Sequence, residues 1–163
     1  YVGYPFIKIL KKLKVRSLLH KKFEYEYKIN SLNNLKLIKI HNGVIKTLKT
    51  LKKNKKIVGI LTSKERIRTL KILSMLKIKV DLILCPHKNL IGKPNPKQIN
   101  DLTKKRRVSK EEIVYIGDMR VDKLTAKNAK VDYIHANYGY GKNIKTKYSI
   151  NKISDIISLN LVI

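Results

Sequence analysis

The chain has one cysteine, no tryptophan and two phenylalanines among its 163 residues. A single cysteine excludes an internal disulfide, and a reducing, cytoplasmic location is the simplest expectation. No apolar run approaches the ~20 residues that a membrane-spanning helix requires, so we expect no membrane partner. The first residues lack both the pattern of a secretory signal and an initiator methionine. We therefore expect that an upstream segment is absent from the sequence.

Acidic residues are also scarce, since 11 Asp and Glu accompany 38 Lys and Arg, for a formal net charge of +27. Such a charge attracts polyanions, which suits a nucleic-acid-associated protein. The lysines are spread over nearly every segment, however, and Lys, Ile and Asn are abundant together, as an AT-rich coding sequence produces. No aromatic-basic motif of RNA-binding type is present. A composition bias is the favoured explanation, and a basic nucleic-acid-associated protein is kept as an alternative.

Apolar periodicity predicts an α/β protein whose first forty residues are helical, over residues 6–13 and 18–29. Short apolar runs of the kind that buried parallel strands show then follow, at 57–61, 80–85, 113–116, 131–136 and 148–150. Helical patterns separate or follow these runs, at 44–56, 65–76, 95–102, 122–130 and 153–159. Alternating strands and helices are typical of an open parallel sheet, Rossmann-like, with crossover helices. The helix at 65–76 is expected to turn inward the residues Ile67, Leu70, Ile72, Leu73 and Leu76.

Polar residues that suit phosphate chemistry fall at the carboxyl ends of these strands, where open parallel sheets bind ligands. Thr62 and Ser63 follow the first strand, Lys93 lies in the loop after the second, and Asp118 ends the third. Asp122 comes one helical turn later, so both carboxylates can face the same point. Lysine can neutralise phosphoryl oxygens, hydroxyls can donate hydrogen bonds to them, and two carboxylates can bind Mg²⁺. The set therefore predicts a phosphoryl-transfer site.

Each residue type also has a structural explanation. Thr62 or Ser63 suits the cap of the next helix, and the helix dipole stabilises acids at a helix N-terminus. Lys93 alone carries no signal in so lysine-rich a chain. Only the joint placement of these residues at successive strand ends favours the phosphoryl site.

Three segments resemble motifs two, three and four of the haloacid dehalogenase-like hydrolases, in family order. They are Ile-Leu-Thr-Ser-Lys (60–64), Gly-Lys-Pro-Asn-Pro (92–96) and Tyr-Ile-Gly-Asp-Met-Arg-Val-Asp (115–122). The most similar branch is that of phosphoglycolate phosphatase-like enzymes with a helical cap, whose loop after the next strand resembles Asn-Tyr-Gly-Tyr-Gly (137–141).

The resemblance implies a role for each matching residue. Thr62 would bind the phosphoryl oxygens and Lys93 would neutralise the phosphoryl group and the nucleophile, which makes both catalytic candidates. Asp118 and Asp122 would hold Mg²⁺. Ser63, placed beside Thr62, is a further candidate for substrate binding.

The first motif of the family, Asp-x-Asp, is absent, since none of the six aspartates forms such a pair. Its first carboxylate attacks phosphorus and forms an aspartyl-phosphate, and its second is the general acid and base. In this family the strand that carries it lies in the middle of the sheet, so two neighbouring strands should lack a shared partner. We therefore expect a partial helical cap at residues 1–40 and, at 41–163, a phosphatase core without its first strand.

The expected function is a magnesium-dependent phosphatase for a small phosphorylated metabolite, a phosphoglycolate-like phosphomonoester. Its nucleophile would lie upstream of this chain, which by itself should be inactive. A non-catalytic relative of the family is the further alternative, and the upstream coding sequence would decide between the two.

Overall fold

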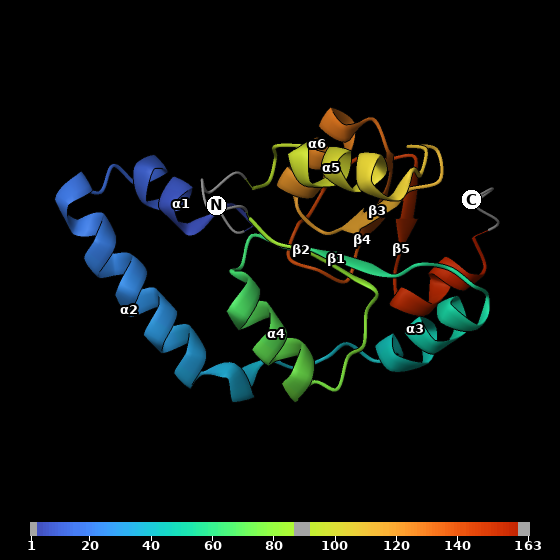
Figure 1. Cartoon of the computed structure of the whole chain (residues 1–163), viewed down its shortest axis with the longest axis horizontal. Coiled ribbons are helices and arrows are strands. Elements are labelled where there is room, and N and C mark those ends of the chain that lie inside the picture. Colours follow the sequence, from blue (N-terminus) through green and yellow to red (C-terminus); the bar gives the residue numbers. More distant parts are fainter. Residues whose placement is uncertain (1–2, 87–91, 160–163) are drawn as a thin grey trace.

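The computed structural model describes residues 3–86 and 92–159, and Figure 1 shows helices packed around short parallel strands. The helices are α1 (Phe6–Lys12), α2 (His20–Asn33), α3 (Val44–Lys53), α4 (Arg66–Met75), α5 (Lys97–Arg106) and α6 (Arg120–Ala129). The strands are β1 (Gly59–Leu61), β2 (Leu82–Leu84), β3 (Val114–Gly117), β4 (Asp132–Ala136) and β5 (Tyr148–Ile150). Short 3₁₀ turns occupy Ser17–Leu19, Leu35–Leu37 and Ile153–Ile157. None of the helices in the described residues is both long and apolar enough to cross a bilayer.

The predicted order of helices and strands is confirmed, with one difference at the end of the chain. The helix expected at 153–159 is a 3₁₀ turn, Ile153–Ile157. The Asp155 carboxylate accepts the N–H groups of Asn151 and Lys152 at 3.0 and 3.1 Å, which ties the turn to the end of β5. The Ser158 hydroxyl then donates to the Asp155 carbonyl, so local hydrogen bonds end the turn instead of extending an α-helix.

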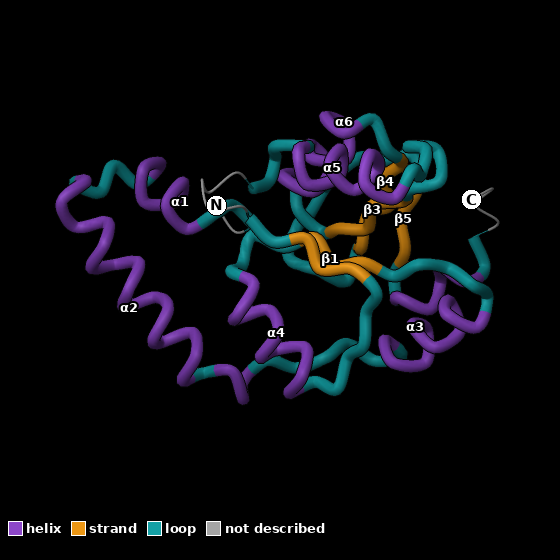
Figure 2. Tube along the Cα trace, in the orientation of Figure 1, coloured by secondary structure: helices purple, strands orange, loops and turns teal. Residues whose placement is uncertain are grey.

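The strands are parallel, as predicted, but they form two sheets, one of β1 and β2 and one of β3, β4 and β5. In the part of the chain that the structure describes, β1 and β3 are each paired along one side only. This division matches the expectation that two strands lack a shared neighbour. In Figure 2, α5 and α6 lie above the strands and α3 and α4 lie below them.

The best-buried part of the molecule lies between α6 and the second sheet. Ala126 and Ala129 on α6 and Ile134 on β4 have no exposed surface, and Ile150 on β5 is 2% exposed. Small side chains allow α6 to approach the sheet closely. Because its N-terminus follows directly on β3, this packing fixes the position of the motif at the β3–α6 junction.

Helix α4 turns a different face to the protein than the apolar pattern predicts. Ile67 and Leu70 are 65% and 44% exposed, whereas Arg68, Thr69 and Leu73 are buried. Apolar residues lie on several sides of this helix, so the sequence period does not select one face and tertiary packing decides. The prediction that Ile67 and Leu70 face inward is wrong.

Helices α1 and α2 lie to one side of the strands (Figure 1). No described residue of α2 is buried. The Tyr27 ring of α2 stacks on Phe6 of α1 at 4.1 Å and faces the Arg68 guanidinium of α4 at 4.8 Å. A surface ion pair joins Lys28 of α2 to Glu65, just before α4, at 3.2 Å. Aromatic and charged contacts therefore link α2 to α4.

Candidate active site

Lys93 and Asp122 meet in a buried ion pair, with 2.6 Å from Nζ to Oδ1. Lys93 comes from the loop after β2 and Asp122 from the first turn of α6, and they are 8% and 3% exposed. A buried charge pair is tolerated only when the remaining donors and acceptors are satisfied. The Tyr115 hydroxyl donates to the same Oδ1 at 2.8 Å, and the Met119 N–H donates to Oδ2 at 3.0 Å. The structure thus brings together two residues that the sequence places at different strand ends.

Asp118 ends β3 and lies under the loop that follows β4. Its Oδ2 accepts the Tyr140 N–H at 2.7 Å. A Cβ at Gly139 would collide with the Asp118 side chain, and one at Gly141 would collide with the Asp118 carbonyl oxygen. Only glycine permits this close approach of the loop. Within the described residues the other carboxylate oxygen, Oδ1, accepts no hydrogen bond, so it is available to a ligand.

Two tyrosines report that both carboxylates share one neighbourhood. Burial, and then the charge and hydrogen bond of Asp122, raise the pKa of Tyr115 far above its ordinary value. Burial, followed by the charges of Asp122 and Asp118, likewise raises the pKa of Tyr133, whose hydroxyl donates to the Gly117 carbonyl at 2.8 Å. Both phenols therefore remain protonated donors. Tyr115 lies in the segment 115–122 that resembles motif four, but its hydrogen bond to Asp122 was not predicted. The sequence indicated it only by a tyrosine in an otherwise aliphatic strand.

Thr62 and Ser63 lie at the carboxyl end of β1, as predicted. The Thr62 Oγ1 accepts the Lys64 N–H at 3.1 Å, and the Ser63 hydroxyl donates to the Gly3 carbonyl at 2.6 Å. Gly3 also packs against Val121, because a Cβ there would lie 2.7 Å from Val121 Cγ1. The end of β1 and the start of α6 therefore meet at the Gly3 backbone. The described residues show no hydrogen bond between the Thr62 and Lys93 side chains.

The two carboxylates fit a hard cation. Asp118 has an unused oxygen, and Oδ2 of Asp122 accepts one hydrogen bond and keeps one lone pair. No cluster of three or more His, Cys, Asp or Glu side chains suited to a metal occurs in residues 3–86 and 92–159. Mg²⁺ needs only one or two carboxylates, with water and substrate oxygens completing its shell. The donors present are thus compatible with Mg²⁺.

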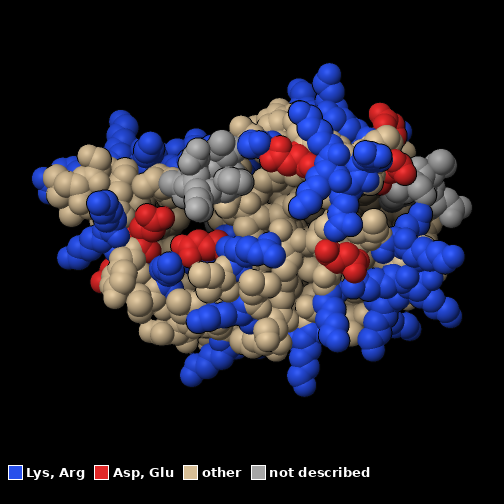
Figure 3. All heavy atoms as spheres, in the orientation of Figure 1, with Lys and Arg blue, Asp and Glu red and all other residues tan. Residues whose placement is uncertain are grey.

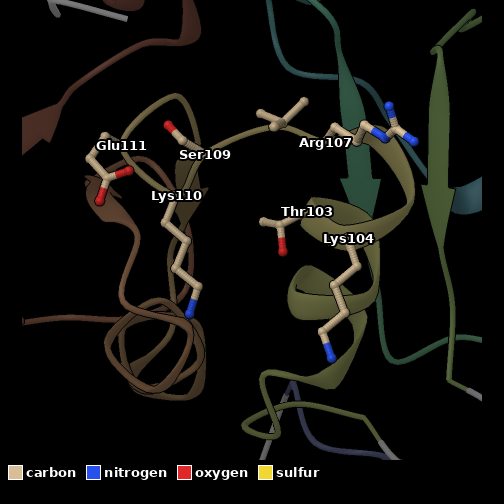
Figure 4. Close-up of a pocket in the computed structure, with 7 residues that line it drawn as sticks. Thr103, Lys104, Arg107, Ser109, Lys110 and Glu111 are labelled. Carbon is tan, nitrogen blue, oxygen red and sulfur yellow. The ribbon is translucent and has the colours of Figure 1, made fainter.

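A shallow depression near the end of α5 offers no comparable arrangement. It is lined by Thr103, Lys104, Arg107, Val108, Ser109, Lys110 and Glu111. Lys104 and Lys110 extend toward the same side of the depression, whereas Arg107 points away from them (Figure 4). The cations do not converge on one point, and none of the predicted site residues lines this surface. The Lys93–Asp122–Asp118 cluster is therefore the better candidate.

Fold and site together place the chain among α/β proteins that bind ligands at the carboxyl ends of parallel strands. The model of the haloacid dehalogenase-like hydrolase family matches residues 1–136, and the chain belongs to this family. The expected resemblance is confirmed. No curated protein sequence matches the chain.

Solved structures of bacterial proteins share the fold. A hydrolase of Pseudomonas syringae has a TM-score of 0.82 at 21% identity, covering 97% of this chain and 78% of that one. A provisionally named phosphoglycolate phosphatase of Lactobacillus plantarum has a TM-score of 0.80 at 21% identity, with 93% and 75% covered. A subfamily IA hydrolase of Geobacter sulfurreducens has a TM-score of 0.67 at 20% identity, with 77% and 58% covered. The chain therefore spans only part of the length of each.

Proposed function

We propose that the chain is the larger part of a magnesium-dependent phosphatase that hydrolyses a small phosphorylated metabolite, a phosphoglycolate-like phosphomonoester. One observation carries the proposal: the buried Lys93–Asp122 pair lies beside Asp118, whose Oδ1 is available, at the carboxyl ends of the strands. A cation held rigidly in a desolvated place stabilises charge on phosphoryl oxygens without reorganisation. The Lactobacillus plantarum relative, by its name, supports the substrate class.

The role proposed for each residue is the one that the family resemblance implies. Lys93, held by Asp122, neutralises the phosphoryl group, and Thr62 donates its hydroxyl to a phosphoryl oxygen. Asp118 and Asp122 would hold Mg²⁺, which when bound would supply positive charge against the oxygens of the transferred group. Ser63 would bind substrate only by giving up its present hydrogen bond to Gly3.

The nucleophile in this proposal belongs to a segment outside the sequence. Support comes from the two separate sheets and from the structural relatives, of which 58–78% is covered. The first carboxylate of an Asp-x-Asp, at the end of a strand between the two sheets, would attack phosphorus and displace the substrate alcohol, which the protonated second carboxylic acid would protonate. The second group, now a carboxylate, would then take a proton from the water that hydrolyses the aspartyl-phosphate and releases phosphate. Upstream coding sequence with Asp-x-Asp after an apolar strand would support this. A gene that begins near residue 1 would favour the non-catalytic relative.

The test uses the full-length protein and a generic monoester, p-nitrophenyl phosphate. Phosphate release should require Mg²⁺ and be abolished by Asp118→Ala, while Asp101→Ala, at a surface ion pair of α5, serves as the matched control. Activity that survives both chelation and Asp118→Ala would reject the mechanism.

The nucleic-acid alternative gains no support from the distribution of charge. On the face in Figure 3, lysine and arginine side chains occur over the N-terminal helices as well as over α3 and α5, so they are not confined to one element. A nucleic-acid surface would gather them into a stripe or patch. The reducing, cytoplasmic setting stays a prediction from the single cysteine.

A further inference from the structure

Helix α4 buries an arginine that lacks an anionic partner. Arg68 is 6% exposed, and its Nε has no hydrogen-bond partner. No carboxylate in residues 3–86 and 92–159 lies within ion-pair distance of it. The carbon of the guanidinium lies over the Tyr27 ring, 4.8 Å from its centroid, a cation–π contact that gives the N–H donors no hydrogen-bond acceptor oxygen. A buried charged donor without an acceptor is costly, so the position calls for an anion.

The choice of buried face on α4 strengthens this inference. The helix exposes Ile67 and Leu70 while it buries Arg68, the reverse of what burial of apolar surface favours. Packing against Tyr27 alone would be served as well by an apolar side chain. The burial of a cation in place of an available isoleucine is therefore better explained by binding than by packing.

Arg68 lies in the first turn of α4 (Arg66–Met75), which begins shortly after Thr62 at the carboxyl end of β1, the strand end where the proposed phosphoryl site lies. Partial desolvation, and then the charges of Arg68 and Lys93, lower the pKa of Lys64, so these three cations lie within electrostatic reach of one another. The acid next in sequence, Glu65, is paired with Lys28 of α2. No ion pair is formed by Lys64 in the described part of the chain. Within the described residues Lys93 is thus paired with Asp122, whereas Arg68 and Lys64 form no ion pair.

We propose that Arg68, assisted by Lys64, binds a carboxylate on the substrate while Lys93 receives the phosphoryl group. The edge of a guanidinium presents paired donors that match a carboxylate, which a lysine or a hydroxyl cannot do. The substrate is then a small phosphomonoester whose carboxylate lies a few atoms from phosphorus. This subsite rests on the proposed phosphatase function, and it adds the residues that bind the carboxylate of the substrate.

The test compares two non-hydrolysable phosphonates that differ by one carboxylate, methylphosphonate and phosphonoacetate. Each is titrated calorimetrically into the full-length protein with Mg²⁺. We expect phosphonoacetate to bind about tenfold tighter or more, as for one charge-assisted hydrogen-bonded pair. Arg68→Met should abolish this preference by weakening phosphonoacetate binding far more than methylphosphonate binding, and Arg68→Lys should restore part of it.

Arg66→Met is the matched control, because Arg66 lies on the same helix, is exposed and only donates to the Ile83 carbonyl at 3.3 Å. It should keep the full preference. Arg68→Gln, which removes the charge but keeps a polar amide group, replaces Arg68→Met if circular dichroism shows that the methionine variant does not fold. Equal weakening of both ligands by the Arg68 variants would indicate a merely structural role and overturn the proposal. So would an unchanged preference, or the absence of any preference in the parent protein.

Phosphate release is measured separately, with phosphomonoesters that carry a carboxylate and with phosphomonoesters that lack one. An Arg68-dependent preference for phosphonoacetate without any phosphate release would leave the subsite standing and reject the phosphatase. Phosphate release with no Arg68-dependent preference would reject the subsite and leave the phosphatase function standing.

Discussion

The buried ion pair between Lys93 and Asp122 allows a quantitative test by a double-mutant cycle. The pair has a separation of 2.6 Å, with side chains 10% and 4% exposed, so little water replaces a lost partner. Removing one half of such a pair costs about 3–5 kcal/mol of unfolding free energy. Lys93→Met should fall at the lower end, because Asp122 keeps its bonds from Tyr115 and Met119. Asp122→Asn should fall at the upper end, because Lys93 loses its one counter-charge.

The double variant Lys93→Met with Asp122→Asn should cost less than the sum of the single variants by about 2–3 kcal/mol, near the upper limit for coupled neighbours. Urea denaturation, followed by circular dichroism, measures the unfolding free energy of the full-length parent protein, of both single variants and of the double variant. The exposed pair of Lys97 and Asp101 is the control, at 3.0 Å with side chains about half exposed. Its coupling should be about 0.3–0.5 kcal/mol. Additive costs at Lys93 and Asp122 would refute the reasoning.

Two further predictions concern the groups around the carboxylates. Because burial raises the pKa of Tyr115, the folded protein keeps this proton above about pH 10, where the unfolded chain releases it, so stability falls as the pH rises past that point. With Tyr115→Phe, the unfolding free energy measured by urea denaturation should decrease less steeply with pH above about pH 10. An equally steep decrease in this variant would count against the buried hydrogen bond. Gly141→Ala places a methyl group against the Asp118 carbonyl and should cost about 1–3 kcal/mol and most of the phosphate release. Gly59→Ala, which meets mainly a neighbouring side chain, should preserve activity; equal losses in both variants would show that the loop does not position Asp118.

The sequence by itself was enough to predict the parallel α/β class and the order of the elements. Apolar runs and helical spacing depend on local backbone geometry, which a single chain displays directly. The same reasoning placed Thr62, Lys93 and Asp118 at strand ends, because parallel strands share one carboxyl edge. The expectation that two strands lack a common neighbour came instead from the family resemblance and its absent first motif, and the described strands form two separate sheets.

Tertiary structure alone decided which side chains meet and which face of a helix is buried. Asp122 was expected near Lys93, 29 residues away in the chain, but the bonds from Tyr115 and Met119 that hold its carboxylate emerge only when β3 and α6 are packed. The apolar periodicity predicted that Ile67 faces inward, whereas packing against α2 buries Arg68 instead. The physical reason is that a helix with apolar residues on several sides has no preferred face of its own. Which face is buried depends on contacts with segments that are distant in sequence. In this protein those contacts bury Arg68, which has no carboxylate partner among the described residues.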